Sequence, residues 1–391
     1  MAALWRGASA GGGIHGEAGQ LVAVTDGAEG LVSKKDSMSP RERLEAVFAG
    51  KQPDHTPILG GWIACPDHIA RLAQVDLETY WRDPVAASIA AYRRLGSDGL
   101  IDLFVPRRRD DFRCVDADTY VGAHNGLSLE QCLDQIDRMP SATDVEAAFD
   151  FEAEYARFAA RLTDRRRKCG QMLWMPAQWG AGAKASWYSD FGYENYFCVI
   201  ALYPDRARKL MEVGGAMGHC QARLVAKAIE DELYPRACLL GEDICTQRGP
   251  MVSPAFLAEH YAPALRHSLK PLLDVGCRCV WHCDGDVRAI LDMLLECGVG
   301  GLQGFQPECG MTIDYVASKR ATDGGRLLIF GPLSVTTELP VCTPEQVKAK
   351  VRRAVEVCRE QADLVVFTAN TINPDVPLEN IVAMHEAVRE G

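Results

Sequence analysis

Short apolar runs alternate with helical patterns along most of this chain of 391 residues. The apolar runs lie at 55–62, 99–105, 171–177, 237–242, 277–282, 300–305, 326–331 and 363–368. Helical periodicity fills intervals between them, for example 204–232, 253–275, 286–298 and 343–361. Strands that alternate with helices pair in parallel through right-handed crossovers, and eight such units close into a barrel. The pattern therefore predicts an α/β protein with a (β/α)8 barrel. The alternative is a doubly wound open sheet, and no Gly-x-Gly-x-x-Gly motif follows the first strand to support it.

The same pattern divides the chain into an extension and one barrel domain. Residues 1–38 are rich in Gly and Ala without a clear period, so we expect a flexible extension. Ser39, Pro40 and Glu42 then supply an N-cap, a first helical residue and a capping box, which places the barrel domain at 39–391. The segment 106–145 is the one long excursion, and we expect it to form a lid or a small hairpin over the barrel mouth.

Composition narrows the class of protein further. The chain is 48% hydrophobic and 24% charged, which is normal for a soluble globular protein. No apolar run reaches the ~18 residues that span a bilayer, and the N-terminus lacks the apolar stretch of a signal peptide. Fifteen cysteines without a Cys-x-x-Cys pair favour reduced thiols and a cytoplasmic location. A net charge of -11 argues against nucleic acid or an anionic membrane as the main partner.

Polar and aromatic residues gather where the predicted strands end. In barrels of this class the C-terminal strand ends carry the active site. Amides and carboxylates there can bind polar atoms of a substrate, and indole rings can wall an apolar pocket. The candidates for substrate binding are Trp62, Gln178, Trp179, Asp243, Glu308 and Asn370.

His282 is the sharpest candidate for catalysis. Side chains alternate faces along a strand, so His282 and Asp284 share a face while Cys283 points the other way. Glu242 ends the preceding strand, where its carboxylate can reach His282. We therefore predict that His282, Asp284 and Glu242 are catalytic and bind a zinc ion with one open position. Alternatively, His282 bonds a backbone carbonyl, and Glu242 caps the next segment or pairs with Arg248.

Several segments resemble uroporphyrinogen-decarboxylase-like proteins from about Met38 to the end. They are SPRERLEAVFAGKQPDHTPI, GEDICTQRGPMVSPAFLAEHYAPAL, VGCRCVWHCDGDV, FGPLSVTTELPVCTPEQV and TINPDVPLENIVAMHEAVRE. The resemblance implies a (β/α)8 barrel. True decarboxylases of this family hold tetrapyrrole carboxylates with an Arg-containing loop after the first strand, and here that position reads GGWIACPDHIA.

The corrinoid-dependent methyltransferase branch is the closer resemblance, including methylcobalamin:coenzyme M methyltransferases and methyltransferase I of demethylase systems. Its members carry a His-x-Cys pair at the fifth strand and a Cys at the eighth. This chain has His282 and Asp284 at the first pair and no Cys near Asn370. The resemblance implies His282 as a zinc ligand, and a carboxylate site leaves more charge on the metal than thiolates do.

We therefore predict transfer of a methyl group from a small methyl ether or methylamine to cobalamin carried by a separate protein. The chain has no Asp-x-His-x-x-Gly element of the kind that ligates corrinoid cobalt, so we expect the partner to supply the corrinoid. The alternatives are a lyase or decarboxylase acting on another acid, and a corrinoid- or tetrapyrrole-binding protein without catalysis.

Overall fold

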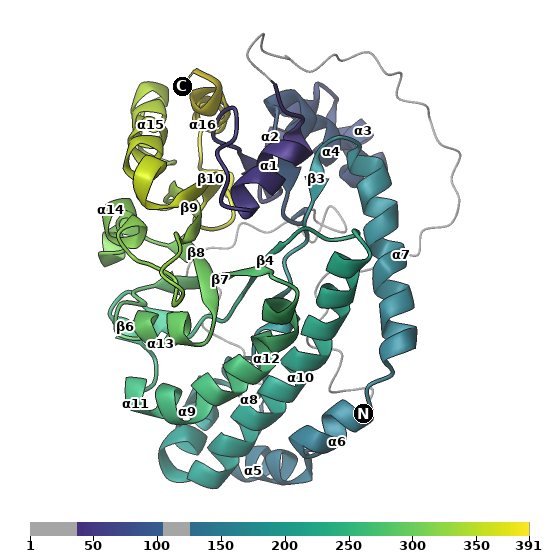
Figure 1. Cartoon of the computed structure of the whole chain (residues 1–391), viewed down its shortest axis with the longest axis vertical. Coiled ribbons are helices and arrows are strands. Elements are labelled where there is room, and N and C mark those ends of the chain that lie inside the picture. Colours follow the sequence, from purple (N-terminus) through teal and green to yellow (C-terminus); the bar gives the residue numbers. More distant parts are fainter. Residues whose placement is uncertain (1–36, 105–125, 391) are drawn as a thin grey trace.

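Parallel strands pair in two sheets that join at both edges. The computed structural model describes residues 37–104 and 126–390 (Figure 1). One sheet has the order β1-β2-β3 and the other β10-β9-β8-β7-β4. The strands are β1 (Leu59–Gly60), β2 (Gly99–Leu100), β3 (Leu173–Trp174), β4 (Ala237–Gly241), β7 (Arg278–Gly285), β8 (Val299–Phe305), β9 (Leu328–Leu333) and β10 (Asp363–Thr368). Each of the eight predicted apolar runs overlaps one of these strands.

Backbone hydrogen bonds close the two sheets into a ring. Val366 N donates to Pro57 O at 2.8 Å, and Ile58 forms a parallel bridge with Val366, which joins β10 to the start of β1. Gln178 N donates to Leu239 O at 2.7 Å, which joins the end of β3 to β4. The predicted (β/α)8 barrel is confirmed, and the open doubly wound sheet is excluded because the sheet has no free edge at these junctions.

Helices surround the strands on all sides. They are α1 (Pro40–Phe48), α2 (Pro66–Ala73), α3 (Leu77–Arg82), α4 (Pro84–Leu95), α5 (Leu129–Arg138), α6 (Ala142–Ala147), α7 (Phe151–Cys169), α8 (Tyr188–Phe191), α9 (Tyr193–Leu202), α10 (Pro204–Glu230), α11 (Pro254–Phe256), α12 (Ala262–Asp274), α13 (Leu291–Glu296), α14 (Ile313–Ala317), α15 (Pro344–Gln361) and α16 (Leu378–Glu390). A π-helical turn, η5 (Leu257–Tyr261), joins α11 to α12 into one helical segment, as the pattern at 253–275 predicted. Two further turns are η4 (Trp179–Ala181) and η6 (Pro307–Cys309), and a hairpin of β5 (Cys245–Thr246) and β6 (Gly249–Pro250) follows β4.

One predicted helix is shorter than its pattern. The periodicity covered 286–298, but α13 begins only at Leu291. Asp286 accepts hydrogen bonds from the backbone N–H and the guanidinium of Arg288, at 3.0 and 2.8 Å. This local side-chain turn competes with helix formation and delays the start of α13.

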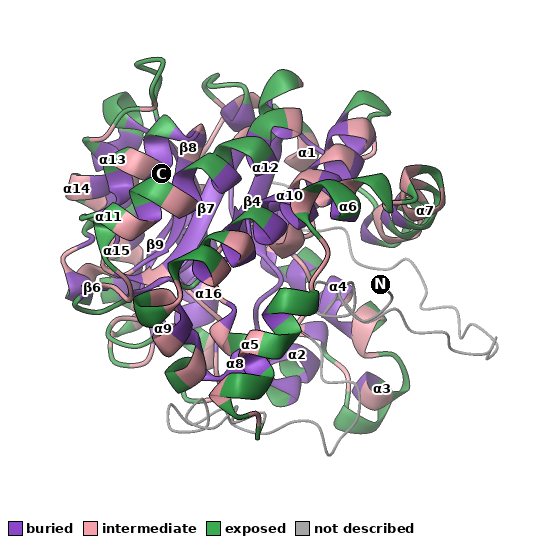
Figure 2. Cartoon of the chain, turned by 90° about the horizontal axis from the view of Figure 1, so that it is seen from below, coloured by how far each residue is buried: buried purple, intermediate pink, exposed green. Residues whose placement is uncertain are grey.

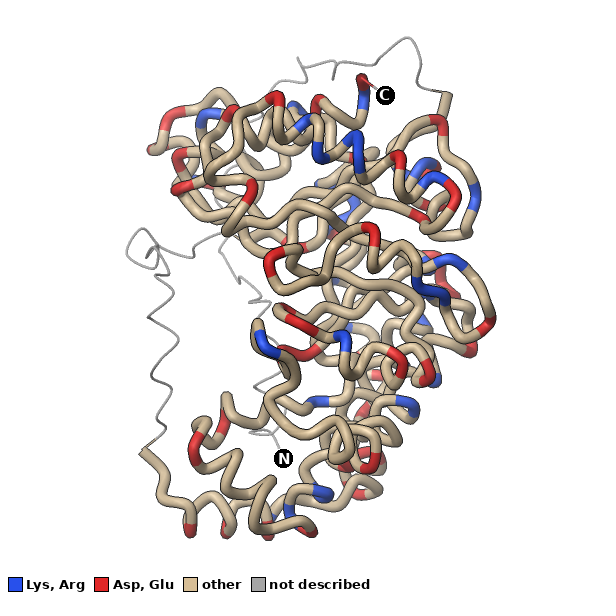
Figure 3. Tube along the Cα trace, turned by 90° about the vertical axis from the view of Figure 1, so that its left-hand side faces the viewer, with Lys and Arg blue, Asp and Glu red and all other residues tan. Residues whose placement is uncertain are grey.

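Burial follows the layers of the barrel. Figure 2 shows buried strands at the centre and helices with exposed outer faces around them. On β7 the alternation is as predicted: the ring of Trp281 meets Tyr261 in the helix layer, while His282 meets Trp62 and Trp179 on the inner side. Figure 3 shows acidic and basic residues interspersed along the outer helices. Within the described residues, no helix has the length and apolar character needed to cross a membrane.

The structure describes the predicted start of the barrel domain and part of the predicted excursion. Ser39 caps α1 with the predicted capping box: Glu42 N donates to Ser39 Oγ, and Ser39 N donates to the Glu42 carboxylate. Most of the extension 1–38 and the first part of the excursion, 106–125, lie outside the described residues, so the flexible extension and the lid stay predictions. The described part of the excursion is helical: it contains α5 and most of α6, both of which pack against α10.

Candidate functional site

Three side chains meet at the C-terminal ends of β4 and β7. His282 Nε2 lies 3.5 Å from Asp243 Oδ1 and 3.9 Å from Asp284 Oδ1. One potential ligand atom from each residue lies within 4.8 Å of the others, and we call this group the mouth cluster. The strands are adjacent and in register, with Gly241 opposite His282, so residues just beyond Gly241 reach the histidine. An imidazole and two carboxylates form a donor set suited to a divalent metal ion.

The orientation of His282 is fixed by Gln303 on β8. The Gln303 amide nitrogen donates to two backbone carbonyls of the last strand, Thr368 O at 2.8 Å and Ala369 O at 2.9 Å. Its amide oxygen therefore faces His282 Nδ1, at 2.5 Å. An oxygen there requires a proton on Nδ1, so the neutral imidazole carries its lone pair on Nε2, the nitrogen that faces the carboxylates. Such outer hydrogen bonds are how proteins set the tautomer of a metal-binding histidine.

A glycine makes room for this arrangement. Gly304 follows Gln303 with φ +82°, and a Cβ added there would lie 2.5 Å from His282 Nδ1. Any other residue would be strained by its backbone and would collide with the ring. The sequence Gln303-Gly304 thus combines an orienting amide with the space that the imidazole needs.

Asp284 is held at one oxygen and open at the other. Asn370 Nδ2 donates to Asp284 Oδ2 at 2.6 Å. Asp284 Oδ1, which faces His282, is buried and has no hydrogen-bond partner in the described structure. Burial raises the pKa of Asp284, and the charges of Asp243 and Glu308 add to the rise, while His282 and the Asn370 amide oppose it. A buried carboxylate oxygen without a partner is unfavourable unless a cation or a proton satisfies it.

Two tryptophans form an apolar wall beside His282. The ring of Trp179 lies 5.2 Å from the imidazole and that of Trp62 lies 6.1 Å from it, both edge-on. Trp62 also stacks on Phe104 at 5.2 Å. The buried indole N–H of Trp62 has no acceptor among the described residues. Both predicted residues thus lie beside His282, and their role as pocket walls stays a prediction.

The structure replaces one member of the predicted metal set. Glu242 does not lie with His282 and Asp284, and Asp243 takes its place. Glu242 Oε2 instead accepts hydrogen bonds from Ala185 N at 3.2 Å, Ser186 N at 2.9 Å and Ser186 Oγ at 2.5 Å. Burial raises the pKa of Glu242 to about 7 despite these donors. Glu242 therefore ties the end of β4 to the segment after η4 rather than offering a ligand.

The other predicted residues surround the cluster in different ways. The Gln178 amide turns back to Pro176 O at 2.9 Å. Glu308 accepts hydrogen bonds from the hydroxyls of three residues, Ser334, Thr336 and Thr337. Among the described cysteines, neither Cys283 nor Cys309 joins the cluster. Cys283 is buried on the opposite face of β7, as strand alternation predicted.

Two functional candidates were missed from the sequence. Gln303 is a polar residue inside the apolar run GGLQGF, and that contrast was the available signal. Asp102 follows β2 with φ +57°, rare for a residue other than Gly, and its carboxylate accepts a hydrogen bond from Ala177 N at 3.2 Å. Burial raises the pKa of Asp102 to about 7. A strained backbone and a perturbed carboxyl at a strand end are features of functional sites.

The fold and the site together define a (β/α)8-barrel protein with a candidate active site of histidine and carboxylates at the C-terminal mouth. Within that class, the family model "Uroporphyrinogen decarboxylase (URO-D)" matches residues 192–391, more than half of the chain. The chain belongs to the uroporphyrinogen decarboxylase family. No curated protein matches it by sequence.

The fold is similar to that of a solved "methyltransferase from Methanosarcina mazei". The TM-score is 0.58 at 15% identity, and the match covers 90% of this chain and 99% of that chain. At this identity the likeness concerns the fold. It extends over the barrel as a whole, including the part of the chain before residue 192.

Proposed function

We propose that this protein is a methyltransferase that moves a methyl group from a small methyl ether or methylamine to the cobalt of a corrinoid on a separate protein. The observation that carries the proposal is the mouth cluster, with His282 Nε2 free to bind and Asp284 Oδ1 buried without a partner. The fold shared with a protein named a methyltransferase supports it. The family's other chemistry, decarboxylation, is less compatible with the residues present.

The charge of the mouth argues against a polycarboxylate substrate. Asp243, Asp284 and Glu308 are carboxylates, and their mutual repulsion already contributes to the raised pKa of Asp284. The segment after β1, at 60–70, contains no Arg or Lys that could hold substrate carboxylates. A neutral or cationic methyl donor is therefore a better electrostatic match than a tetrapyrrole acid.

The cluster fits a zinc ion. His282, Asp243 and Asp284 would hold it, since a bound cation would satisfy the orphaned Asp284 oxygen and use the lone pair that Gln303 leaves on His282. Bound zinc would act as a Lewis acid on the donor's heteroatom, an effect worth several kcal/mol in the transition state.

In this proposal the chain's own residues exclude water and orient the methyl donor. Trp62 and Trp179 exclude water from one side of the cluster and leave the Trp62 N–H to orient the donor. The bond between methyl carbon and heteroatom breaks, the heteroatom keeps the electron pair and takes a proton from water, and the carbon bonds to reduced cobalt. Holding donor and cobalt in line is the main contribution that binding can make to such a displacement.

The test is methylation of an added corrinoid protein. The purified chain should bind no stoichiometric cobalamin itself, but with a methyl ether or methylamine it should methylate a reduced corrinoid-carrying protein, followed by the cobalt absorbance and by the demethylated product. Purification with one tightly bound cobalamin, or the absence of transfer across a panel of such donors with metal bound, would contradict the proposal.

A further inference from the structure

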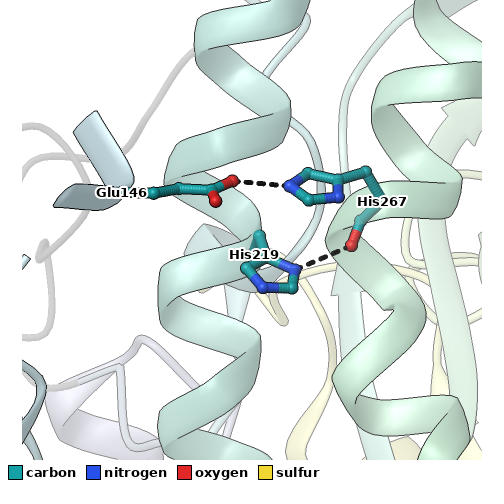
Figure 4. Close-up of side chains that lie close together, drawn as sticks. All are labelled: Glu146, His219 and His267. Carbon is teal, nitrogen blue, oxygen red and sulfur yellow. Dashed lines mark hydrogen bonds and ion pairs between the residues drawn. The ribbon is translucent and has the colours of Figure 1, made fainter. Parts of the chain in front are cut away.

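A second group of metal-binding side chains lies on the outer helices. Glu146 comes from α6, His219 from α10 and His267 from α12, and Figure 4 shows them pointing toward one another. One potential ligand atom from each lies within 4.8 Å of the others, and we call this group the wall cluster. It shares no residue with the mouth cluster, and the proposed methyl transfer does not use it.

The helices approach each other closely at this point. A Cβ on Gly215 of α10 would lie 2.9 Å from Ala264 Cβ of α12, and a Cβ on Gly218 would lie 2.1 Å from Ser268 Oγ. Glycine in a helix interior lowers stability by about 0.5–1 kcal/mol relative to alanine, so the close packing is obtained against helix propensity. His219 follows Gly218, and His267 precedes Ser268, so the two imidazoles lie beside the tightest contact, with ring centres 4.3 Å apart.

Hydrogen bonds leave a free lone pair in the group. His219 Nδ1 lies 3.0 Å from the carbonyl oxygen of His267. A carbonyl only accepts, so Nδ1 carries the proton and Nε2 carries the lone pair. His267 Nε2 lies 2.5 Å from Glu146 Oε1, a contact that holds one shared proton. A metal ion can replace that proton, as it does when neutral imidazole and carboxylate become ligands.

The change of geometry needed is small. Around tetrahedral zinc with bonds of about 2.0 Å, two ligand atoms lie about 3.3 Å apart. Glu146 and His267, now 2.5 Å apart, must therefore separate by less than 1 Å, and the ligand atom of His219, within 4.8 Å of both, must approach them by at most about 1.5 Å. The side chains of Glu146 and His267 are 33% and 47% exposed, which leaves both free to rotate.

We propose that Glu146, His219 and His267 form a second divalent-metal site, best suited to Zn²⁺, that fastens α6 to α10 and α12. Two imidazoles and one carboxylate match the ligand preferences of zinc and leave a fourth position for water. Because α6 belongs to the excursion after β2, a bound ion would fasten that excursion to the outer face of the barrel. A metal that joins separate elements stabilises the folded state by its binding free energy.

The experiment removes the mouth site first. Full-length His282→Ala protein, stripped with a chelator, is titrated with Zn²⁺ and the bound metal is counted by mass spectrometry. One equivalent should remain in His282→Ala and be lost in His282→Ala/His267→Ala. His260→Ala in place of His267→Ala is the matched control, because His260 lies on the same helical segment outside the cluster and should leave that equivalent bound.

Hydrogen exchange gives a second readout, specific to the wall. Zinc should slow amide exchange in 142–147 in the wild type and in His260→Ala, and should not do so in His219→Ala. Circular dichroism of the metal-free variants establishes that they fold. If His282→Ala binds no zinc, or if the double variant keeps its equivalent, or if exchange in 142–147 ignores zinc, the proposal is wrong.

Discussion

The barrel mouth and the helix wall each bring three potential zinc ligands together. The two clusters differ in whether their polar atoms have partners when no metal is bound. At the mouth, His282 is 8% exposed, and Asp284 Oδ1 is buried without a partner. At the wall, Glu146 and His267 already bond to each other and remain open to water. The mouth cluster is therefore unsatisfied without a ligand, whereas the wall cluster is satisfied without one.

The two clusters also differ in how their ligands are held in position. Orienting amides hold two of the three mouth residues: Gln303 holds His282, and Asn370 holds Asp284. The wall imidazoles are positioned mainly by helix packing around Gly215 and Gly218. Preorganised ligands bind more tightly than ligands that must reorient. We therefore expect the mouth to bind metal more tightly and the wall to depend more on local motion.

Removal of His282 should have the largest effect. With the proposed zinc at the mouth, His282→Ala should lose that metal and lower methyl transfer by about 10²- to 10⁴-fold, which corresponds to several kcal/mol of Lewis-acid stabilisation. Metal analysis and single-turnover methylation measure the two effects. Cys283→Ser is the control: its thiol lies on the other face of β7, so metal should stay bound. Loss of metal in Cys283→Ser would show that the inner face of this strand is assigned wrongly.

Substitution of each acidic residue in turn should distinguish the roles of Asp243 and Glu242 in metal binding. Asp243→Asn removes a negative charge 3.5 Å from His282 Nε2 and should weaken metal binding at the mouth. Glu242→Gln should leave binding in place, because its carboxylate is engaged with Ser186 and Ala185. Competition titration against a chromogenic chelator gives both affinities. The reverse order of effects would restore Glu242 to the ligand set.

Removal of the Gln303 amide should make the mouth cluster less preorganised, as the wall cluster is, and so lower its metal affinity. Gln303→Leu leaves His282 without the acceptor that fixes its tautomer, and loss of such an outer partner typically lowers metal affinity or activity by about 10- to 100-fold. The same titration measures it, and the nitrogen chemical shifts of His282 report the tautomer directly. An unchanged tautomer in Gln303→Leu would remove the positioning role from Gln303.

The last expected effect concerns stability alone and is the pH dependence contributed by Glu242. Its pKa is raised from 4.5 to about 7 in the folded protein, so the fold favours the protonated carboxyl. The folded state binds more protons than the unfolded state between these values; the contribution is therefore full below pH 4.5 and is lost as pH rises through about 7.

At about 1.4 kcal/mol per pH unit, this loss amounts to at most about 3.5 kcal/mol, and contact with water reduces it. Glu242→Gln mimics the protonated form. Its free energy of unfolding relative to the wild type should therefore rise between pH 5 and pH 8, as measured by urea denaturation of metal-free protein. A constant difference across that range would contradict the raised pKa.

Local sequence determined much of the barrel and two of the three residues of the mouth cluster. Period-two alternation along 277–282 placed His282 and Asp284 on one face and Cys283 on the other, and eight apolar runs predicted eight strands. These predictions succeeded because a strand's alternation and its burial between helices depend on short-range geometry.

Only the tertiary structure decided which other side chains join His282 and Asp284 at the mouth. The alternation of β4 breaks at Gly241, where φ is +156° and β4 passes so close to His282 that a Cβ would lie 2.1 Å from its carbonyl oxygen. Beyond that point Glu242 turns to amides from another segment, and Asp243 turns to the histidine. The wall cluster likewise needs three helices from distant parts of the chain to meet at particular rotations, a condition that no local pattern encodes.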